Sequence, residues 1–353
     1  MKKRNMAIEG LRGLAILLVV ASHTGVLGQG GVGVAIFLAL SGFFASSPFR
    51  AEFQRESLTP KGILKYYMAR IVRVCPVYWV TIALVYLLTT GYFTDARQLL
   101  RCALFIECPG HFWFLQQVMF FYLCTPAFNL LLFGVDRLAG KLRLSGHLAC
   151  AAVLILLSWL SYRYLTVGRA YLMGNGGKQV IRFFQFLPGM AAGYLYKWIK
   201  SHRWDEAVPK GLKILLGVYP ILFFLFCILS SGHIITLVYP ESKLMIGWDM
   251  PVLCSGLACV CVLAFLLAPD SFSNKLYASL VFRYVGEISF PTFIIHWYLL
   301  GLFHKPYAAF DFIAVLTLTL GAATLAHVVI EEPCAMLYRN RKWSEVREYF
   351  AKF

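Results

Sequence analysis

The two ionisable side chains of the first long apolar segment, Arg12 and His23, have the residue types and the spacing best suited to chemistry. On a helix, their separation of eleven residues leaves them about 20° apart on one face and about 16 Å apart along the axis. The unperturbed pKa of histidine, about 6.5, suits proton transfer near neutral pH. The pair predicts a polar channel in which Arg12 holds a cytoplasmic anion and His23 handles a proton deeper in the bilayer. A snorkelling arginine and a hydrogen-bonded interhelical histidine are the alternative.

The composition indicates which elements carry these residues. Of the 353 residues, 59% are hydrophobic and 14% are charged, and the mean hydropathy is +0.69. A soluble chain has about 25% charged residues, and the apolar runs here lack the alternation of membrane-barrel strands. We therefore expect an all-α polytopic transmembrane bundle, a single domain over residues 1–353. Its ten spans are expected at residues 11–27, 32–47, 74–90, 112–133, 148–167, 179–196, 212–230, 250–268, 288–303 and 312–330.

Lysine and arginine are divided unevenly between alternate connections. Of the 33, 24 lie in the two termini and the connections in phase with them, six lie in the other set, and three fall within spans. Because basic residues mark cytoplasmic loops, we expect a multi-pass protein of the inner (cytoplasmic) membrane with both termini cytoplasmic. The same distribution argues against nucleic acid as a partner, since such binders gather basic residues on one patch, and membrane lipids are the expected surroundings.

The ten cysteines do not predict a metal site. The chain has no CxxC pair and no Cys/His spacing typical of metal ligands. Cys102 and Cys108 share a connection expected to be extracytoplasmic, and a disulfide between them is an alternative that the sequence leaves open.

Further candidate residues lie near the ends of the predicted spans. Arg70 and Arg73 share a helix face at the cytoplasmic mouth of the third span, either as ordinary positive-inside residues or as a phosphate clamp. Arg182, early in the sixth span, is a buried charge that needs a partner. The external end of the fourth span carries an aromatic belt or the lining for a sugar-like acceptor, formed by His111, Trp113 and Tyr122. The ninth span carries Ser289 and His296.

Several short motifs, taken in order, resemble those of the acyltransferase family 3 membrane proteins. Residues 9–15, which begin with Glu9, lead to His23 with the family's Arg-to-His spacing, and residues 33–44 contain the Leu-Ser-Gly-Phe motif with Ser41. The later matches are residues 70–73 with Pro76, Tyr78 and Trp79; 111–115 with Tyr122; Arg182 with Pro188 and Gly189; 286–289 with His296; and 330–333. The resemblance covers nearly the whole chain. It departs at Gln116, Gln117 and Met119, where many members carry acidic residues.

The resemblance implies a ten-helix enzyme that moves an acyl group, commonly acetyl, from cytoplasmic acyl-CoA to a hydroxyl of an extracytoplasmic or lipid-linked glycan. Catalysis is expected from His23 and Arg12, and acyl-CoA binding from Arg70, Arg73 and Arg182. The expected acceptor and supporting residues are Glu9, Ser41, His111, Trp113, Tyr122, Ser289 and His296. Acetyl-CoA is then a substrate, no permanently bound cofactor is expected, and a homo-oligomer is left open.

Two other functions are consistent with the same residues. A secondary transporter or flippase would use Arg12 and His23 for ion or proton coupling, although the internal repeats and interrupted helices typical of transporters are not evident. A partner protein that kept the fold and lost the activity would explain the altered motif of the fourth span.

Overall fold

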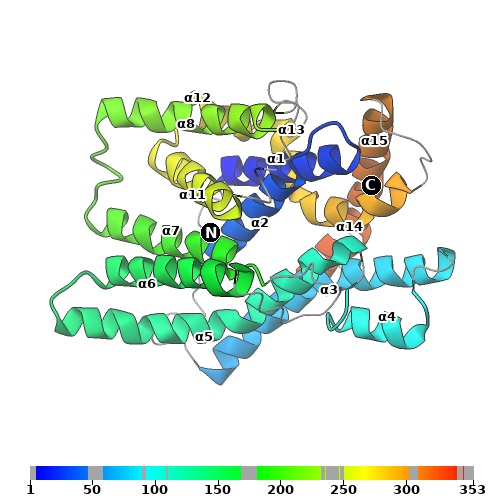
Figure 1. Ribbon diagram of the computed structural model, residues 1–353, viewed down its shortest axis with the longest axis horizontal. Coiled ribbons are helices and arrows are strands. Elements are labelled where there is room, and N and C mark those ends of the chain that lie inside the picture. The colour runs from blue at the N-terminus through cyan, green and yellow to red at the C-terminus, as the bar shows by residue number, and fades with distance from the viewer. Residues whose placement is uncertain are drawn as a thin grey trace.

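The computed structural model describes residues 5–46, 59–89, 93–108, 110–167, 181–231, 235, 246, 250–301, 309–339 and 345. These residues form helices and no strands, which confirms the predicted all-α class (Figure 1). The helices are α1 (Met6–His23), α2 (Gly30–Ala45), α3 (Pro60–Leu88), α4 (Ala96–Ala103), η3 (Gly110–Phe112), α5 (Trp113–Lys141), α6 (Gly146–Ser161), η4 (Tyr162–Val167), α7 (Phe183–Ser201), α8 (Lys210–Leu229), α11 (Pro251–Leu267), α12 (Phe272–Tyr277), α13 (Leu280–Glu287), α14 (Ser289–Leu300), α15 (Ala309–Ala326), η5 (His327–Glu331) and α16 (Glu332–Tyr338).

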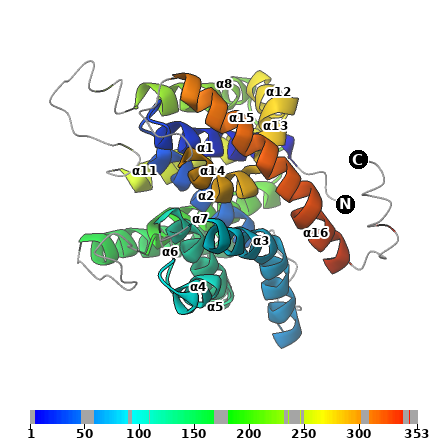
Figure 2. The same cartoon turned by 90° about the vertical axis from the view of Figure 1, so that its right-hand side faces the viewer.

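The bundle is organised around α1 and α2. Helix α2 packs against α1, α7 and α11, and α7 packs in turn against α6. Helix α1 is covered by α13 and α14, and α14 also packs against α15. In Figure 1, α5, α6, α7 and α8 run along the long axis, while Figure 2 shows α15 and α16 crossing the bundle near one end. The first two helices therefore form the interior onto which the later ones are assembled.

Each of the ten predicted spans coincides with a helix. Six helical segments are long and apolar enough to cross a membrane, and α2 and α11 are shorter apolar helices. The six are Met6–His23, Pro60–Leu88, Gly110–Lys141, Gly146–Tyr164, Lys210–Leu229 and Asp311–Tyr338. The chain is thus a multi-pass membrane protein. The number of ten spans and the side on which the termini lie stay predictions.

The structure corrects the ends of the first predicted span. Helix α1 starts five residues before position 11, because the Asn5 side chain caps it by accepting a hydrogen bond from the Ala7 N–H at 3.0 Å. It ends at His23 instead of continuing to position 27. Gly25 has a φ of 76°, and the left-handed turn there is one that stops helices and favours glycine. His23 is consequently the last residue of its helix.

The helix ends also change the surroundings of the predicted arginines. Helix α3 begins at Pro60, with Thr59 as its cap, so Arg70 and Arg73 lie within a helix of 29 residues, and their place at the cytoplasmic mouth of the span stays a prediction. Arg182 is the residue just before α7, where the prediction placed it within the sixth span. Both differences arise because caps and turns, which set helix ends, are weaker sequence signals than apolar runs.

Glycines bring the backbones of the central helices into contact. A Cβ atom on Gly13 or Gly286 would clash with a carbonyl oxygen across the α1–α13 contact, and one on Gly33 would clash with the Ala15 carbonyl across the α1–α2 contact. A Cβ atom on Gly42 or Gly189 would likewise clash with a carbonyl oxygen across the α2–α7 contact. In a membrane the lipid is as apolar as the side chains, so close packing of small residues is a principal source of helix association.

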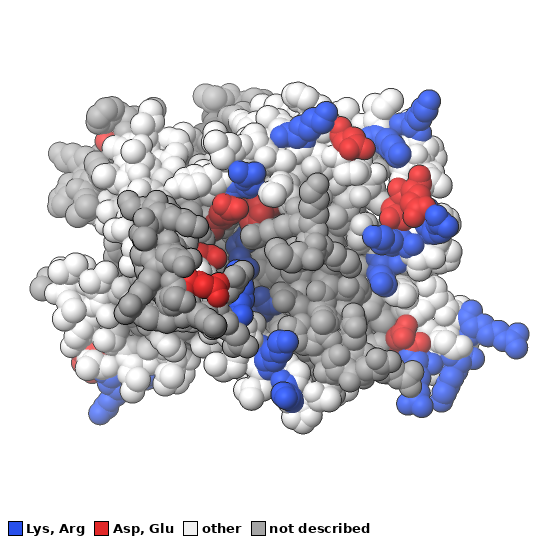
Figure 3. All heavy atoms as spheres, turned by 180° about the vertical axis from the view of Figure 1, so that it is seen from behind, with Lys and Arg blue, Asp and Glu red and all other residues white. Residues whose placement is uncertain are grey.

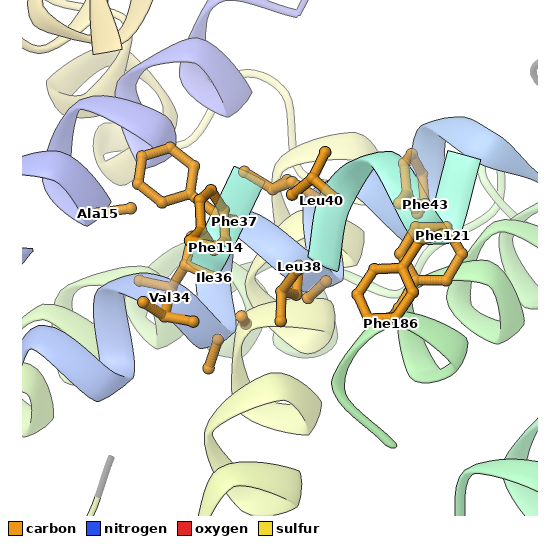
Figure 4. Packing of buried hydrophobic residues seen from close by; sticks show 14 of the residues in the cluster. Ala15, Val34, Ile36, Phe37, Leu38, Leu40, Phe43, Phe114, Phe121 and Phe186 are labelled. Carbon is orange, nitrogen blue, oxygen red and sulfur yellow. The ribbon is translucent and has the colours of Figure 1, made fainter. Parts of the chain in front are cut away.

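The buried side chains of α2 show how this interior is filled. Phe37 packs against Phe114 of α5 with ring centroids 6.0 Å apart, and further along the helix Phe43 lies near Phe121 and Phe186 (Figure 4). The rings of Phe121 and Phe186 are 4.9 Å apart and join α5 to α7. An apolar helix buried on several faces therefore connects the parts of the bundle that carry the polar residues.

Basic side chains are concentrated at one end of the bundle. Figure 3 shows Lys and Arg gathering toward the edge where α5 leads to α6 and α7 leads to α8. The exposed cations of these connections include Arg137, Lys141, Arg143, Lys200 and Arg203. Helices α4 and α14 lie toward the opposite end (Figure 1).

We expect Gly189→Val to destabilise the bundle, because its side chain would meet the Ala39 carbonyl and the Phe43 amide and force α2 and α7 apart. Overpacking costs about 1–3 kcal/mol or more, so the melting temperature of the detergent-solubilised protein should fall by several degrees. Gly134→Val is the matched control, since a Cβ there meets nothing within 4 Å. Equal melting temperatures for the two variants would contradict the close α2–α7 contact.

Candidate active site

A pair of histidines from two helices forms the centre of the candidate site. His23, at the end of α1, and His296, within α14, have Nδ1 and Nε2 respectively 2.8 Å apart. Their rings are stacked, with centroids 5.0 Å apart and an interplanar angle of 9°. His296 is buried and His23 is half-buried. Residues separated by 273 positions in the chain thus share one hydrogen bond.

The hydrogen-bond partners of the pair determine its tautomers. Nδ1 of His296 lies 2.7 Å from the carbonyl oxygen of Phe293 and 3.2 Å from that of Thr292. A carbonyl oxygen only accepts, so Nδ1 of His296 carries the proton and its Nε2 has the lone pair. Nδ1 of His23 must then donate to that Nε2. The Nε2 of neutral His23 is therefore left with a lone pair, which is the form required of a general base or nucleophile.

A third imidazole, His111, lies beside the pair. Its Nε2 donates to the carbonyl oxygen of Ile294 at 3.0 Å, and its ring meets that of His296 edge to face at 5.7 Å. Its Nδ1 is buried and has no hydrogen-bond partner among the residues that the structure describes. The predicted site residues His23, His111 and His296 are therefore brought together.

Aromatic rings pack against His23 and His111. Trp297 contacts His23 edge to face at 5.0 Å and stacks on His111 at 5.7 Å, and Tyr298 packs edge to face on His111 at 5.4 Å. Trp297 and Tyr298 are not among the predicted site residues, and the signal in the sequence that could have identified them is their position directly after His296.

Within the described part of the chain, no group of three or more His, Cys, Asp or Glu is arranged to hold a metal ion. The three imidazoles use two of their nitrogens on backbone carbonyls and two on one another. What they can do chemically is accept, hold and donate protons.

Arg12 is paired with an acid of its own helix. Its Nη1 lies 3.4 Å from a carboxylate oxygen of Glu9, which is buried, and Arg12 itself is half-buried. The helix rise places Arg12 about 16 Å from His23 along α1. The predicted support residue Glu9 thus neutralises and orients the predicted anion-binding residue.

Arg70 is held between two aromatic rings. Its guanidinium lies 5.0 Å from the ring centroid of Tyr66 and 5.0 Å from that of Tyr122, and its side chain is buried. Arg73, one turn later, is half-buried. Tyr122, predicted to line the acceptor site with Trp113, therefore contacts the arginine predicted to bind the donor.

Arg182 lies against Trp113. Its guanidinium is 5.0 Å from the Trp113 ring centroid, its backbone N–H donates to Oε1 of Gln117 at 3.1 Å, and its Nη1 donates to Oε1 of Gln185 at 3.2 Å. Arg182 is predicted to bind acyl-CoA together with Arg70 and Arg73, but the structure places it beside the start of α5. Gln117 enters the prediction only as a departure from the family pattern, and Gln185 is not among the predicted residues.

The two predicted serines have different surroundings. Ser289 is fully buried at the start of α14, and its hydroxyl has no hydrogen-bond partner among the described residues. Ser41 is half-buried on α2. The proposed supporting roles of both stay predictions.

Cys102 and Cys108 are free thiols in the structure, so the disulfide left open by the sequence is not formed in it. Both are buried beside the Tyr78 hydroxyl, which lies 3.0 Å from the Cys102 sulfur and 3.6 Å from the Cys108 sulfur. The hydrogen bond between the thiols lowers the pKa of Cys102 and raises that of Cys108. This packing holds the connection that leads to His111.

Comparison with known proteins places the chain among acyltransferases. The acyltransferase domain family matches residues 5–331. The peptidoglycan O-acetyltransferase OatA of Listeria monocytogenes is 24% identical over 328 residues, which are 84% of this chain and 49% of OatA. The putative membrane-bound transacylase BcsY of Komagataeibacter xylinus is 37% identical over 84 residues, 24% of this chain and 20% of BcsY. The chain thus spans about half the length of the first relative and less of the second. No solved structure matches it.

We expect Arg70→Met to destabilise the protein more than Arg73→Met. Arg70 loses two cation–π contacts, each worth about 0.5–2 kcal/mol when desolvated, whereas Arg73 has no such buried enclosure. Thermal unfolding of the two purified variants measures the difference. A melting temperature for Arg70→Met equal to that of Arg73→Met would show that the two rings contribute nothing.

Proposed function

The chain belongs to the acyltransferase domain family, and we propose that it is a membrane O-acyltransferase that moves an acetyl group from acetyl-CoA to a hydroxyl of a cell-surface glycan. The observation that carries this proposal is the hydrogen-bonded pair of His23 and His296, which leaves Nε2 of His23 free to accept a proton. The pair lies within the region that matches the family.

The proposed reaction uses His23 as a general base. Its Nε2 takes the proton of the acceptor hydroxyl while the oxygen attacks the thioester carbonyl of the donor. The carbon–sulfur bond then breaks, and the departing CoA sulfur receives the proton back from Nε2, so that an ester and a free thiol are formed. An alternative order, in which Nε2 first carries the acetyl group, requires the same lone pair.

His296 stabilises the charged intermediate state of His23. When Nε2 of His23 is protonated, its Nδ1–H still donates to His296, whose own Nδ1–H is shared by the carbonyl oxygens of Phe293 and Thr292. These fixed dipoles face the imidazolium without needing to reorient, which is how preorganised sites lower barriers. His296 thus acts through His23 as a positioning residue.

The donor is proposed to enter from the basic end of the bundle. Coenzyme A is strongly anionic, and the exposed cations of the α5–α6 and α7–α8 connections would attract it. Arg70 and Arg73 are proposed to bind its phosphates, and Arg12 to hold the thioester arm between that end and His23. We propose that this end is cytoplasmic, as are both termini, and that the membrane is the cytoplasmic one.

The acceptor is proposed to be a polysaccharide or a lipid-linked precursor of one. The relative OatA is a peptidoglycan O-acetyltransferase, which supports a glycan acceptor. The aromatic surroundings of His23 and His111 also suit saccharide rings. Arg182 lies beside Trp113, so we now propose that it serves the acceptor end of the site.

We expect His23→Ala to abolish acetyl transfer, with a loss of at least about a hundredfold, because the general base is removed. The measurement is consumption of labelled acetyl-CoA by protein in liposomes, together with the O-acetyl content of surface glycans from complemented deletion cells. Membrane insertion and yield should match those of the wild type. Retained glycan acetylation in this variant would refute the role of His23, and substrate flux without thioester consumption would favour a transporter.

His296→Gln should retain more activity than His296→Leu. A glutamine carbonyl can occupy the place of the imidazole Nε2 and accept the His23 N–H, whereas leucine leaves that donor unpaired. We expect His296→Leu to lower kcat about tenfold to a hundredfold and the glutamine variant distinctly less. Equal losses in the two variants would indicate that His296 contributes only volume to the site.

A further inference from the structure

Two glutamines flank Arg182 from different helices. Gln117 lies on α5 one turn after Trp113, and Gln185 lies on α7 one turn after Arg182. Both glutamine side chains are fully buried, with 0% of their surface exposed. The cluster formed by Trp113, Gln117, Arg182 and Gln185 is called here the amide cluster.

The orientation of each amide follows from its partner. Oε1 of Gln117 accepts the backbone N–H of Arg182, and Oε1 of Gln185 accepts a guanidinium N–H of the same residue. Because both partners are donors, the contacting atoms must be the amide oxygens. The two Nε2 atoms are therefore NH₂ groups, and each is able to donate two hydrogen bonds.

No described residue pairs with either NH₂ group. Both Nε2 atoms are buried and have no hydrogen-bond partner among the residues that the structure describes. A buried donor left unpaired costs about 1–3 kcal/mol, so two such donors around one arginine weaken the fold unless a bound group satisfies them. Because both NH₂ groups are hydrogen-bond donors, a group that binds to them must carry acceptor oxygens.

The position of the amide cluster points to the acceptor. Trp113 follows His111 by two residues, so the cluster lies at the end of α5 that carries the imidazoles. The exposed cations Arg137 and Lys141 are on the last turns of the same helix, more than about 30 Å away by helix rise. The amide cluster therefore lies on the imidazole side of the bundle, where the acceptor is proposed to bind.

Resting on the proposed acyltransferase function, we propose that the NH₂ groups of Gln117 and Gln185 bind a carbonyl or carboxylate oxygen of the acceptor saccharide. An acylamino group and a uronic carboxylate both offer such sp² oxygens, which accept hydrogen bonds without donating, whereas the hydroxyls of a plain hexose both accept and donate. The amide cluster thereby selects glycans with N-acyl or carboxyl substituents and holds the sugar near His23.

The experiment compares three trisaccharides of the same β-1,4 linkage: chitotriose with acetamido groups, cellotriouronate with carboxylates, and cellotriose with neither. Binding to the full chain in nanodiscs is followed by ligand-observed NMR titration. We expect chitotriose or cellotriouronate to bind at least about tenfold more tightly than cellotriose. Binding of chitotriose would identify the oxygen as that of an acylamino group, and binding of cellotriouronate would identify it as that of a carboxylate. Equal binding of all three, or binding of none, would overturn the proposal.

The Gln185→Glu variant tests the role of the Gln185 NH₂ group. The glutamate keeps an oxygen for the Arg182 guanidinium, so the fold is preserved, but it replaces the NH₂ group with an acceptor. We expect the preference over cellotriose to disappear, while Gln98→Glu, in α4, keeps it. Gln98 uses its Oε1 on the Thr94 N–H at 2.8 Å, so this control makes the same charge change outside the cluster. A preference retained in Gln185→Glu contradicts the proposal.

Measuring both saccharide binding and acetyl transfer distinguishes this proposal from the proposed function. His23→Ala should lose acetyl transfer and keep the saccharide preference, because the imidazole is not part of the amide cluster. If that variant keeps transfer, the catalytic assignment fails while the binding assignment stands. If Gln185→Glu weakens acetyl-CoA binding and leaves saccharide binding unchanged, the cluster serves the donor and the acceptor assignment is overturned.

Discussion

Close backbone contact along α1 is the constraint on which the site depends. Gly13 of α1 meets the carbonyl of Phe282, Gly286 of α13 meets that of Glu9, and Gly33 of α2 meets that of Ala15. These contacts set the rotation and depth of α1 relative to its neighbours, since rotating α1 would bring larger side chains against backbone. A hydrogen bond of 2.8 Å between side chains on α1 and α14 requires that accuracy. In a bilayer, such packing has to replace the hydrophobic effect as the source of precision.

The helix ends add a second level of positioning. The left-handed turn at Gly25 follows the last residue of α1, His23, and its cap Thr24, so the imidazole lies at a helix terminus and is half-buried. His296 lies within α14, where the carbonyls of Thr292 and Phe293 are within reach of its Nδ1. The direction of donation along the pair follows from this difference alone. One histidine is fixed by its own helix, and it fixes the other.

Much of the fold could be predicted from the sequence, because long apolar runs report helices and each predicted span holds one. The spacing of Arg12 and His23 also gave their common helix face. The pairing of His23 with His296 could not be predicted, since it depends on how α14 packs against α1. The different neighbours of Tyr122 and Trp113 could not be predicted for a similar reason: the two rings are nine residues apart along α5, and different arginines lie against them. Sequence position along one helix does not reveal which neighbour lies opposite.

The polar groups of the interior therefore divide by charge and chemistry along α1 and α5. Arg12, held by Glu9, and Arg70, held by Tyr66 and Tyr122, lie toward one end. Arg182 is the exception, since it lies against Trp113 toward the imidazoles. Toward the other end are imidazoles whose protons are directed by carbonyl oxygens. Fixed cations suit an anionic substrate, whereas neutral imidazoles suit proton transfer with an uncharged hydroxyl. An interior that separates these two functions over about 16 Å of one helix can receive two unlike substrates from opposite ends, provided that the reacting arm of one is long enough to reach the other.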